Sequence, residues 1–267
     1  STQGYSSAAS DVYKRQSIVS GNDNVGGIIG ENDGGINYTL EEDGTVTWSK
    51  GTVENVVNAT GVTGTGNNVG GLLGTNIGSV ENGRNNGAIT GNDYVGGLVG
   101  INGENSTLTN LVNDSSAAIT GEQYVGGIAG SNAGTITTGN EETDETVNLI
   151  NRGTITGQHY VGGVAGSNSG TITNANNDVE LNVKDSTADA QYFGGIAGVN
   201  TKDGIINNAT NTADVNADGA DYVGGIVGKN DGTLKDMAGN SGTVTGGEFV
   251  GGVAGLNTNN KPLDGVE

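Results

Sequence analysis

Short apolar stretches alternate with glycine, asparagine and aspartate along this chain, and the alternation repeats with a long period. A nine-residue block, aromatic-Val-Gly-Gly-apolar-apolar-Gly-x-Asn, occurs eight times with modest variation. Its valine position falls at Val25, Val69, Val95, Val125, Val161, Phe193, Val223 and Val250. Successive positions are 44, 26, 30, 36, 32, 30 and 27 residues apart. Self-similarity at a fixed period of this length is typical of a solenoid with one repeat in each coil.

Each repeat contains three candidate strands. The first is the block itself, as in residues 124–132; the second is a Gly-Thr-Ile-Thr segment at 134–137; the third is the Gly-Thr-Ile-Thr-Gly of 153–157. In each Thr-Ile-Thr the isoleucine can point inward while both threonines face outward, since side chains alternate along a strand. The pattern predicts an all-β fold, a parallel β-helix (β-solenoid) of about eight coils with roughly three short strands per coil.

The predicted solenoid covers residues 17–257. Residues 1–16 match no repeat and resemble a sequence-assembly artefact, and residues 258–267 form a tail or the start of a further coil. We expect insertions mainly between the second and third strands, at 140–147 and 178–190, and an extra partial coil in the long first gap around Trp48. The chain is interpreted as a module of a longer protein.

The asparagine that closes the block occurs in every repeat, at Asn32, Asn76, Asn102, Asn132, Asn168, Asn200, Asn230 and Asn257. In a stack of in-register coils these residues lie above one another, so each amide can donate to the carbonyl of the next. We interpret the row as a structural ladder rather than a ligand site.

An aromatic residue directly precedes the valine position in six repeats. The row comprises Tyr94, Tyr124, Tyr160, Tyr192, Tyr222 and Phe249, whereas Asn24 and Asn68 hold this position in the first two repeats. One interpretation is a ligand-binding platform on which sugar rings stack; the other is a column of rings stacked on one another. Strand parity leaves the ring direction open, because the Gly-Gly step can be a bulge. The structural column is favoured, since aromatic side chains contribute most through packing.

The block resembles the GLUG motif, a short glycine-rich repeat of bacterial surface and secreted proteins. The resemblance rests on Gly70-Gly71-Leu72-Leu73-Gly74, Gly96-Gly97-Leu98-Val99-Gly100 and their six equivalents, so it spans residues from about 17 to 257. Proteins with this motif include adhesins and IgA-specific metallopeptidases. The resemblance implies an extracellular or cell-surface location and a scaffold role, and it transfers no catalytic residue to this chain.

Composition and charge limit the classes of partner and binding site that this chain can have. The net charge is -20, which disfavours nucleic acid and anionic membrane surfaces as partners. The chain has no cysteine, so disulfides and thiolate metal sites are excluded, and no run approaches the roughly 18 apolar residues of a membrane span. We therefore expect no membrane insertion in this segment.

Catalytic and metal chemistry find little support in the sequence. The single histidine, His159, occupies a variable position two residues before the valine, and the acidic pairs Glu41-Glu42 and Glu141-Glu142 lie in the insertions. No calcium-binding nonapeptide or EF-hand loop occurs. We expect no enzyme activity, no cofactor and no dedicated metal site.

Two functional interpretations from different classes remain. The first is a non-enzymatic structural or adhesive module, a stalk or fibre-forming segment whose partners are other copies of itself, glycans or surface proteins. The second is an ice-binding solenoid that uses outward threonines, at Thr135 and Thr137, Thr154 and Thr156, Thr171 and Thr173, and Thr243 and Thr245. Ala88, Ala118, Asp214 and Lys235 interrupt these threonine ranks, which favours the first interpretation.

Overall fold

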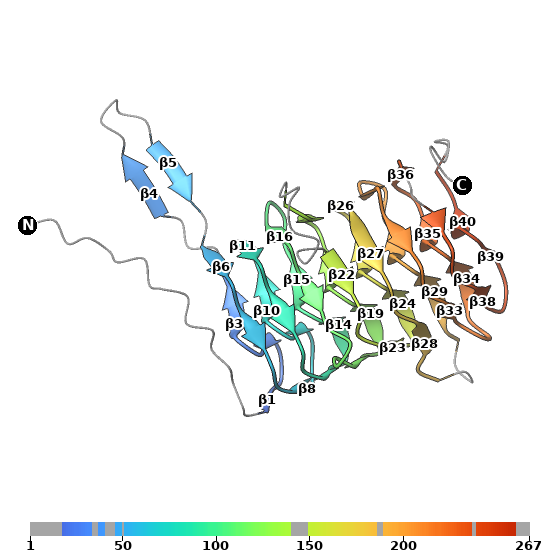
Figure 1. Ribbon diagram of the computed structural model, residues 1–267, viewed down its shortest axis with the longest axis horizontal. Helices are drawn as coiled ribbons and strands as arrows, with labels where there is room; N and C mark the ends of the chain where they lie inside the picture. Colours follow the sequence, from blue (N-terminus) through green and yellow to red (C-terminus); the bar gives the residue numbers. More distant parts are fainter. Residues whose placement is uncertain are drawn as a thin grey trace, which may run out of the picture.

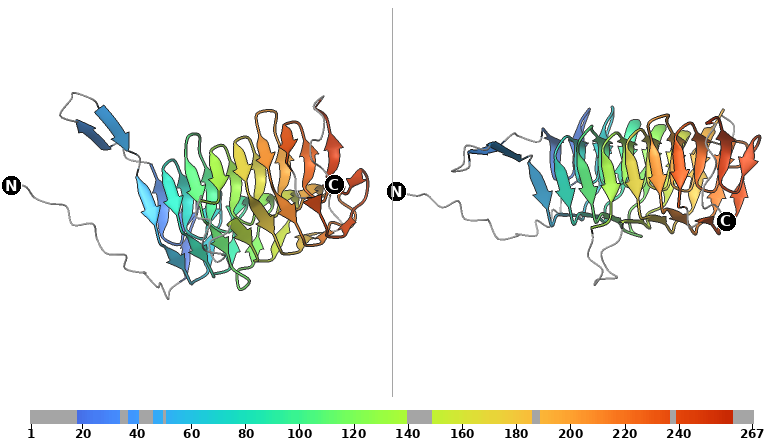
Figure 2. Two further views of the ribbon diagram at one scale, coloured as in Figure 1. Left: turned by 45° about the horizontal axis from the view of Figure 1, so that its top comes forward. Right: turned by 90° about the horizontal axis from the view of Figure 1, so that it is seen from above.

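The computed structural model describes residues 18–33, 37–40, 46–49, 51–139, 149–185, 189–236 and 239–259. Over these residues the chain winds into a straight stack of coils, with its blue N-terminal coil at one end and its red C-terminal coil at the other (Figures 1 and 2). The predicted β-solenoid is therefore confirmed. The sequence-based assignments of residues 1–16 and of the tail beyond residue 259 lie outside the described residues.

Five parallel sheets run along the rod, numbered here in the order in which one coil passes through them. Sheet 1 contains β1 (Val19–Gly21), β8 (Val62–Gly64), β13 (Ile89–Thr90), β18 (Ile119–Thr120), β23 (Ile155–Gly157), β28 (Leu181–Val183), β33 (Val215–Asn216) and β38 (Val244–Thr245). Sheet 2 contains β2 (Val25–Gly26), β9 (Val69–Gly70), β14 (Asp93–Gly96), β19 (Gln123–Gly126), β24 (His159–Gly162), β29 (Gln191–Gly194), β34 (Asp221–Gly224) and β39 (Val250–Gly251).

The other three sheets complete each coil. Sheet 3 contains β3 (Ile29–Asn32), β10 (Leu73–Asn76), β15 (Val99–Asn102), β20 (Ala129–Asn132), β25 (Ala165–Asn168), β30 (Ala197–Asn200), β35 (Val227–Asn230) and β40 (Ala254–Asn257). Sheet 4 contains β6 (Thr52–Glu54), β11 (Ser79–Glu81), β16 (Thr107–Thr109), β21 (Thr135–Thr137), β26 (Thr171–Thr173), β31 (Ile205–Asn207) and β36 (Thr233–Lys235). Sheet 5 contains β7 (Val57–Asn58), β12 (Arg84–Asn85), β17 (Val112–Asn113), β22 (Leu149–Asn151), β27 (Ala175–Asn177), β32 (Thr210–Asn211) and β37 (Gly239–Asn240).

Each coil thus has five short strands rather than the predicted three. The glycine block is divided into two strands, such as β19 and β20, because the chain bends at its second glycine. Sheet 5 was not anticipated, because its short strands lie at variable distances from the glycine block. Sheets 1 to 3 have eight strands and sheets 4 and 5 have seven, so the coil that the eighth block begins is incomplete within the described residues, and complete coils number fewer than eight.

Two predicted insertions differ from the observed ones. The long first gap contains an antiparallel hairpin, β4 (Asn37–Leu40) with β5 (Val46–Ser49), and not a partial coil; it projects away from the rod (Figure 1). Residues 178–190 are not one insertion, because they include β28 of sheet 1. Residues 140–147 lie outside the described residues.

The block asparagines lie at the end of sheet 3 and form one continuous ladder. Each side-chain Nδ2 donates to the Oδ1 of the next asparagine toward the C-terminus, from Asn32 to Asn257, over 2.8–2.9 Å. The six interior members are fully buried. Their amides also satisfy backbone groups at the corner leading to sheet 4; Asn76, for example, donates to the carbonyl of Gly78 and accepts from its N–H.

A second ladder closes the corner between sheets 5 and 1. It comprises Asn58, Asn85, Asn113, Asn151, Asn177, Asn211 and Asn240, linked over 2.8–3.0 Å with the same polarity. The turn is also the same, since Asn85 donates to the Gly87 carbonyl and accepts from its N–H. The shared signal is an asparagine two residues before the turn residue. It was missed because insertions of variable length separate it from the glycine block.

The interior consists of two apolar clusters, with the largely buried second asparagine ladder and the glycines that pack on it between them. One cluster includes Leu72, Leu98 and Ile128, and the other includes Val95 and Val125; all five are fully buried. Between them, the second glycine of the first seven blocks packs against the second asparagine ladder, whereas Gly252 of the last block has no such neighbour among the described residues. A Cβ on Gly127 would lie 2.2 Å from the Gly163 carbonyl oxygen and 2.3 Å from Cγ of Asn151. The block therefore needs glycine here for space.

We predict that Asn132→Ala lowers the free energy of unfolding by about 2 kcal/mol, because it leaves neighbouring ladder amides buried and unpaired. Asn132 accepts from Asn102 and donates to Asn168. The control is Asn67→Ala, which removes an exposed amide outside the asparagine ladders. Urea denaturation measures both; an equal, small loss for the two variants would contradict a stabilising role of the ladder.

Candidate functional site

Five tyrosines of sheet 2, together with Phe249, which directly precedes β39, form one uninterrupted column along the rod. Successive ring centroids are 4.7, 4.5, 5.1, 5.0 and 4.8 Å apart, and neighbouring ring planes are inclined by only 4–13°. The spacing follows the distance between hydrogen-bonded strands, because in-register coils place each ring above the last. The five tyrosines are half-buried and Phe249 is exposed.

Every member of the column has a left-handed backbone, with φ between 54° and 65°. Bulky residues rarely adopt this conformation, whereas asparagine tolerates it. Asn24 and Asn68 occupy the same position with φ of 52° and 61° and hydrogen bond to each other over 2.8 Å. The column is therefore maintained against a local backbone cost, which ring stacking and burial offset.

Glycine in the following coil permits this close backbone approach. A Cβ on Gly130 would lie 2.4 Å from the carbonyl carbon of Tyr94, and one on Gly166 would lie 2.4 Å from that of Tyr124. The third glycine of the block is thus required by the aromatic residue of the preceding coil. The two features, separated in sequence, form one structural unit.

Self-stacking determines which part of each ring a ligand can reach. Parallel neighbours cover both faces of every interior ring, so a sugar could stack face to face only on an end ring such as Phe249, which is 52% exposed. The remaining accessible part of the column is a row of ring edges and phenolic hydroxyls. This row can accept or donate hydrogen bonds and can lose electrons to an oxidant.

The surroundings raise the pKa of two tyrosines in the column. Burial, and then the neighbouring phenols Tyr160 and Tyr94, raise the pKa of Tyr124; burial, followed by Tyr160 and Tyr222, also raises the pKa of Tyr192. Lys229 lies close to Tyr192 and forms an ion pair with Asp231 over 2.8 Å. Tyr124 and Tyr192 therefore remain protonated in neutral solution.

We predict that the protein loses stability as the pH rises above about 10, the usual range of tyrosine. The folded state holds these protons more tightly than the unfolded state, so the stabilisation is present below the unfolded pKa and is lost as pH rises through the folded pKa. Urea denaturation midpoints measured from about pH 8 to about pH 12, roughly two units on either side of the usual tyrosine pKa, test this loss of stability. A Tyr124→Phe, Tyr192→Phe variant should have a shallower decline; an unchanged slope would contradict the prediction.

The residues considered for catalysis do not converge on one place. His159 begins β24, is half-buried and lies beside Tyr160, with ring centroids 6.5 Å apart. Glu41-Glu42 and Glu141-Glu142 lie outside the described residues. Over the described part of the chain, no three histidine, aspartate or glutamate side chains gather closely enough to hold a metal ion.

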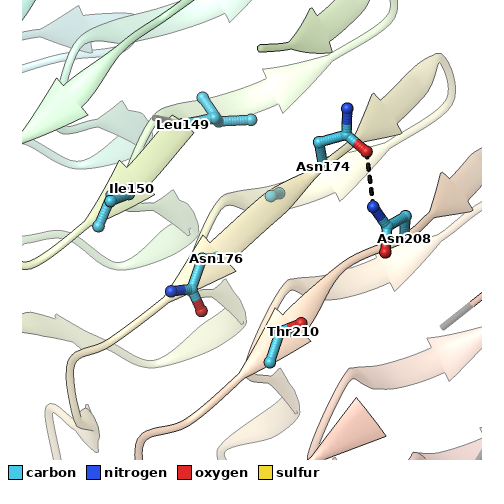
Figure 3. A pocket seen from close by; sticks show the side chains of 7 residues that line it. Leu149, Ile150, Asn174, Asn176, Asn208 and Thr210 are labelled. Carbon is cyan, nitrogen blue, oxygen red and sulfur yellow. Dashed lines mark hydrogen bonds between the residues drawn. The ribbon is translucent and has the colours of Figure 1, made fainter. Parts of the chain in front are cut away.

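A hollow of about 310 Å³ lies on the outer side of sheet 5, over β22, β27 and β32 (Figure 3). Its walls combine Leu149 and Ile150 with uncharged polar side chains. These are Asn174, Asn176, Asn208 and Thr210. Asn208 donates to Asn174 over 2.8 Å, while Oδ1 of Asn176 is buried with no partner. Amides and a hydroxyl beside an apolar wall suit a neutral polar group, and none of these side chains can act as an acid or base at neutral pH.

The candidate ice-binding threonines fall on two different sheets. Thr135, Thr137, Thr171 and Thr173 belong to sheet 4, whereas Thr156 and Thr245 belong to sheet 1. Sheet 4 carries a contiguous patch in two rows, formed by Thr107, Thr135 and Thr171 and by Thr109, Thr137 and Thr173. Lys235 and Asn207 end the second row toward the C-terminus.

No helix occurs in the described part of the chain, and hence none there is long and apolar enough to cross a membrane. Comparison with models of known protein families, with curated proteins and with solved structures finds no match.

Proposed function

We propose that this chain is a non-enzymatic structural and adhesive β-solenoid module, a stalk or fibre-forming segment located outside the cell or on a bacterial surface. The supporting observation is that two asparagine ladders and the aromatic column run from coil to coil along one straight rod. Such repetition adds length and stiffness coil by coil, because each coil contacts only its neighbours. The GLUG-like blocks and the net charge of -20 are consistent with a solvated surface protein.

The aromatic column is the proposed adhesive surface, with glycans or surface proteins as partners. We predict that the fluorescently labelled protein binds cells or immobilised glycans. Changing Tyr124, Tyr160 and Tyr192 to asparagine should abolish this binding and change the free energy of unfolding only slightly. Asparagine suits the position because Asn24 and Asn68 already occupy it. The matched control changes Thr63, Thr90 and Thr156 to asparagine, since Asn182 and Asn216 occupy the same outward row of sheet 1.

End-to-end pairing of coils is the proposed route to a fibre. Val250 is 43% exposed in the last described coil, and unpaired strand edges readily pair with another copy. Electron microscopy of concentrated chain should show filaments that Val250→Asp prevents. Ile77→Asp, at a side position that is 39% exposed, should leave them intact. A monomeric chain that also binds no cell or glycan would remove support for both parts of the proposal.

Ice binding is the second candidate, favoured only by the two threonine rows of sheet 4. Their outward hydroxyls and methyls flank the fully buried Leu108 and Ile136 and so lie on a regular surface. Thermal hysteresis of the purified chain tests this function directly. Activity that Thr137→Lys removes would support it, whereas unaltered ice growth would exclude it.

A further inference from the structure

The tyrosine column has a chemical property that an adhesive or structural role does not require. Five tyrosines, Tyr94, Tyr124, Tyr160, Tyr192 and Tyr222, occupy consecutive coils with parallel rings 4.5–5.1 Å apart. Because the rings are nearly parallel and belong to in-register coils, equivalent atoms of neighbouring rings are also close. The ortho carbons of one phenol therefore face those of the next.

The column is also accessible. All five tyrosines are half-buried, so their ring edges reach solvent even though their faces are covered. The closest pair, Tyr124 and Tyr160, has a centroid separation of 4.5 Å and an interplanar angle of 6°. The two rings are thus adjacent within one molecule and open to a reagent, and coupling requires only that their ortho edges turn toward each other.

We propose that the tyrosine column is an oxidative modification site, at which peroxide-driven one-electron oxidation joins tyrosines of adjacent coils as dityrosine. Each of two neighbouring phenols loses one electron and one proton to become a phenoxyl radical. The radicals form one carbon–carbon bond between ortho positions, and each ortho hydrogen then moves to its own phenolic oxygen. Hydrogen peroxide accepts the two electrons and two protons and is reduced to two molecules of water.

Dityrosine links would stabilise this chain in the way that disulfide bonds stabilise other proteins. The chain has no cysteine, so disulfide bonds cannot tie its coils together. A link between Tyr124 and Tyr160 closes a loop across 36 residues and restricts the unfolded chain in the same manner as a disulfide. The expectation that the protein meets peroxide rests on the proposed extracellular location, whereas the chemistry depends on the column alone.

Phenylalanine is a non-reactive substitute for tyrosine that already occurs in this column. Phe249 stacks on Tyr222 at 4.8 Å and 4°, so phenylalanine fits the column but cannot form a phenoxyl radical. Two variants then have the same composition and differ only in adjacency. The alternating variant, Tyr124→Phe with Tyr192→Phe, separates the three remaining column tyrosines; the contiguous variant, Tyr192→Phe with Tyr222→Phe, leaves Tyr94, Tyr124 and Tyr160 adjacent.

The experiment treats dilute purified chain with a haem peroxidase and hydrogen peroxide, and measures dityrosine fluorescence and cross-linked peptides by mass spectrometry. We expect roughly tenfold more dityrosine in the contiguous variant than in the alternating one, because only neighbours held in place couple efficiently. The wild-type product should contain linked peptides of adjacent column tyrosines, lack two hydrogens per link and unfold at a higher urea concentration.

Equal yields in the two variants would overturn the proposal, as would links that join mainly separate molecules or the tyrosines outside the column, Tyr5, Tyr13 and Tyr38. Circular dichroism confirms that both variants keep the wild-type fold, and a fivefold phenylalanine variant sets the background. Failure of this test leaves the proposed stalk function intact. A wild-type chain that forms no filaments and binds no cell or glycan would remove support for that function without altering the dityrosine yield.

Discussion

Ile128→Asp is expected to unfold several coils at once, with a loss of at least about 4 kcal/mol in the free energy of unfolding. Ile128 is fully buried within the larger apolar cluster, and its backbone bonds to the coil that follows. A carboxylate there loses its hydration and finds no charged partner. Because each coil supports its neighbours, the damage extends along the rod.

Hydrogen exchange combined with urea denaturation measures both the size and the reach of this effect. The control is Ser131→Asp, three residues further along, where the side chain faces outward from β20 and is only half-buried. It should change the free energy of unfolding by less than about 0.5 kcal/mol. Loss of exchange protection confined to the one mutated coil would contradict the expected coupling between coils.

Gly127→Ala is expected to destabilise the solenoid by about 3 kcal/mol. The added methyl group would lie 2.2 Å from the Gly163 carbonyl oxygen and 2.3 Å from Cγ of Asn151, distances that no carbon can adopt. Relief requires movement of a buried backbone and of the second asparagine ladder together. The cost is therefore a steric one, and it combines overpacking with loss of the Asn151 hydrogen bonds to its neighbours.

Gly61→Ala is the matched control, because its Cβ would meet only the Ala88 carbonyl oxygen at 3.7 Å, an ordinary contact. The two variants have the same composition and differ only in position, so urea denaturation compares them directly. If Gly127→Ala were as stable as Gly61→Ala, the close packing of glycine against the second asparagine ladder would not be required for the fold.

The repeat by itself determined the architecture. Eight blocks at similar spacing require stacked coils, since a short apolar strand can be buried only against its equivalents in neighbouring repeats. For the same reason the ladder from Asn32 to Asn257 could be predicted in register before any coordinates. In-register stacking places identical positions above one another, whatever the shape of the coil in cross-section.

The cross-section of the coil was decided only by tertiary structure. The second ladder, which includes Asn85 and Asn113, has no constant distance from the glycine block and is identified by its contact with glycines across the interior. The hairpin of β4 and β5 likewise lacks a signal that distinguishes it from a partial coil. The direction of the tyrosine rings was undetermined as well, because it depends on a left-handed backbone that tyrosine rarely adopts. The glycine of the next coil lets the following backbone pack closely against the tyrosine, and that is a contact between repeats rather than a property of any one of them.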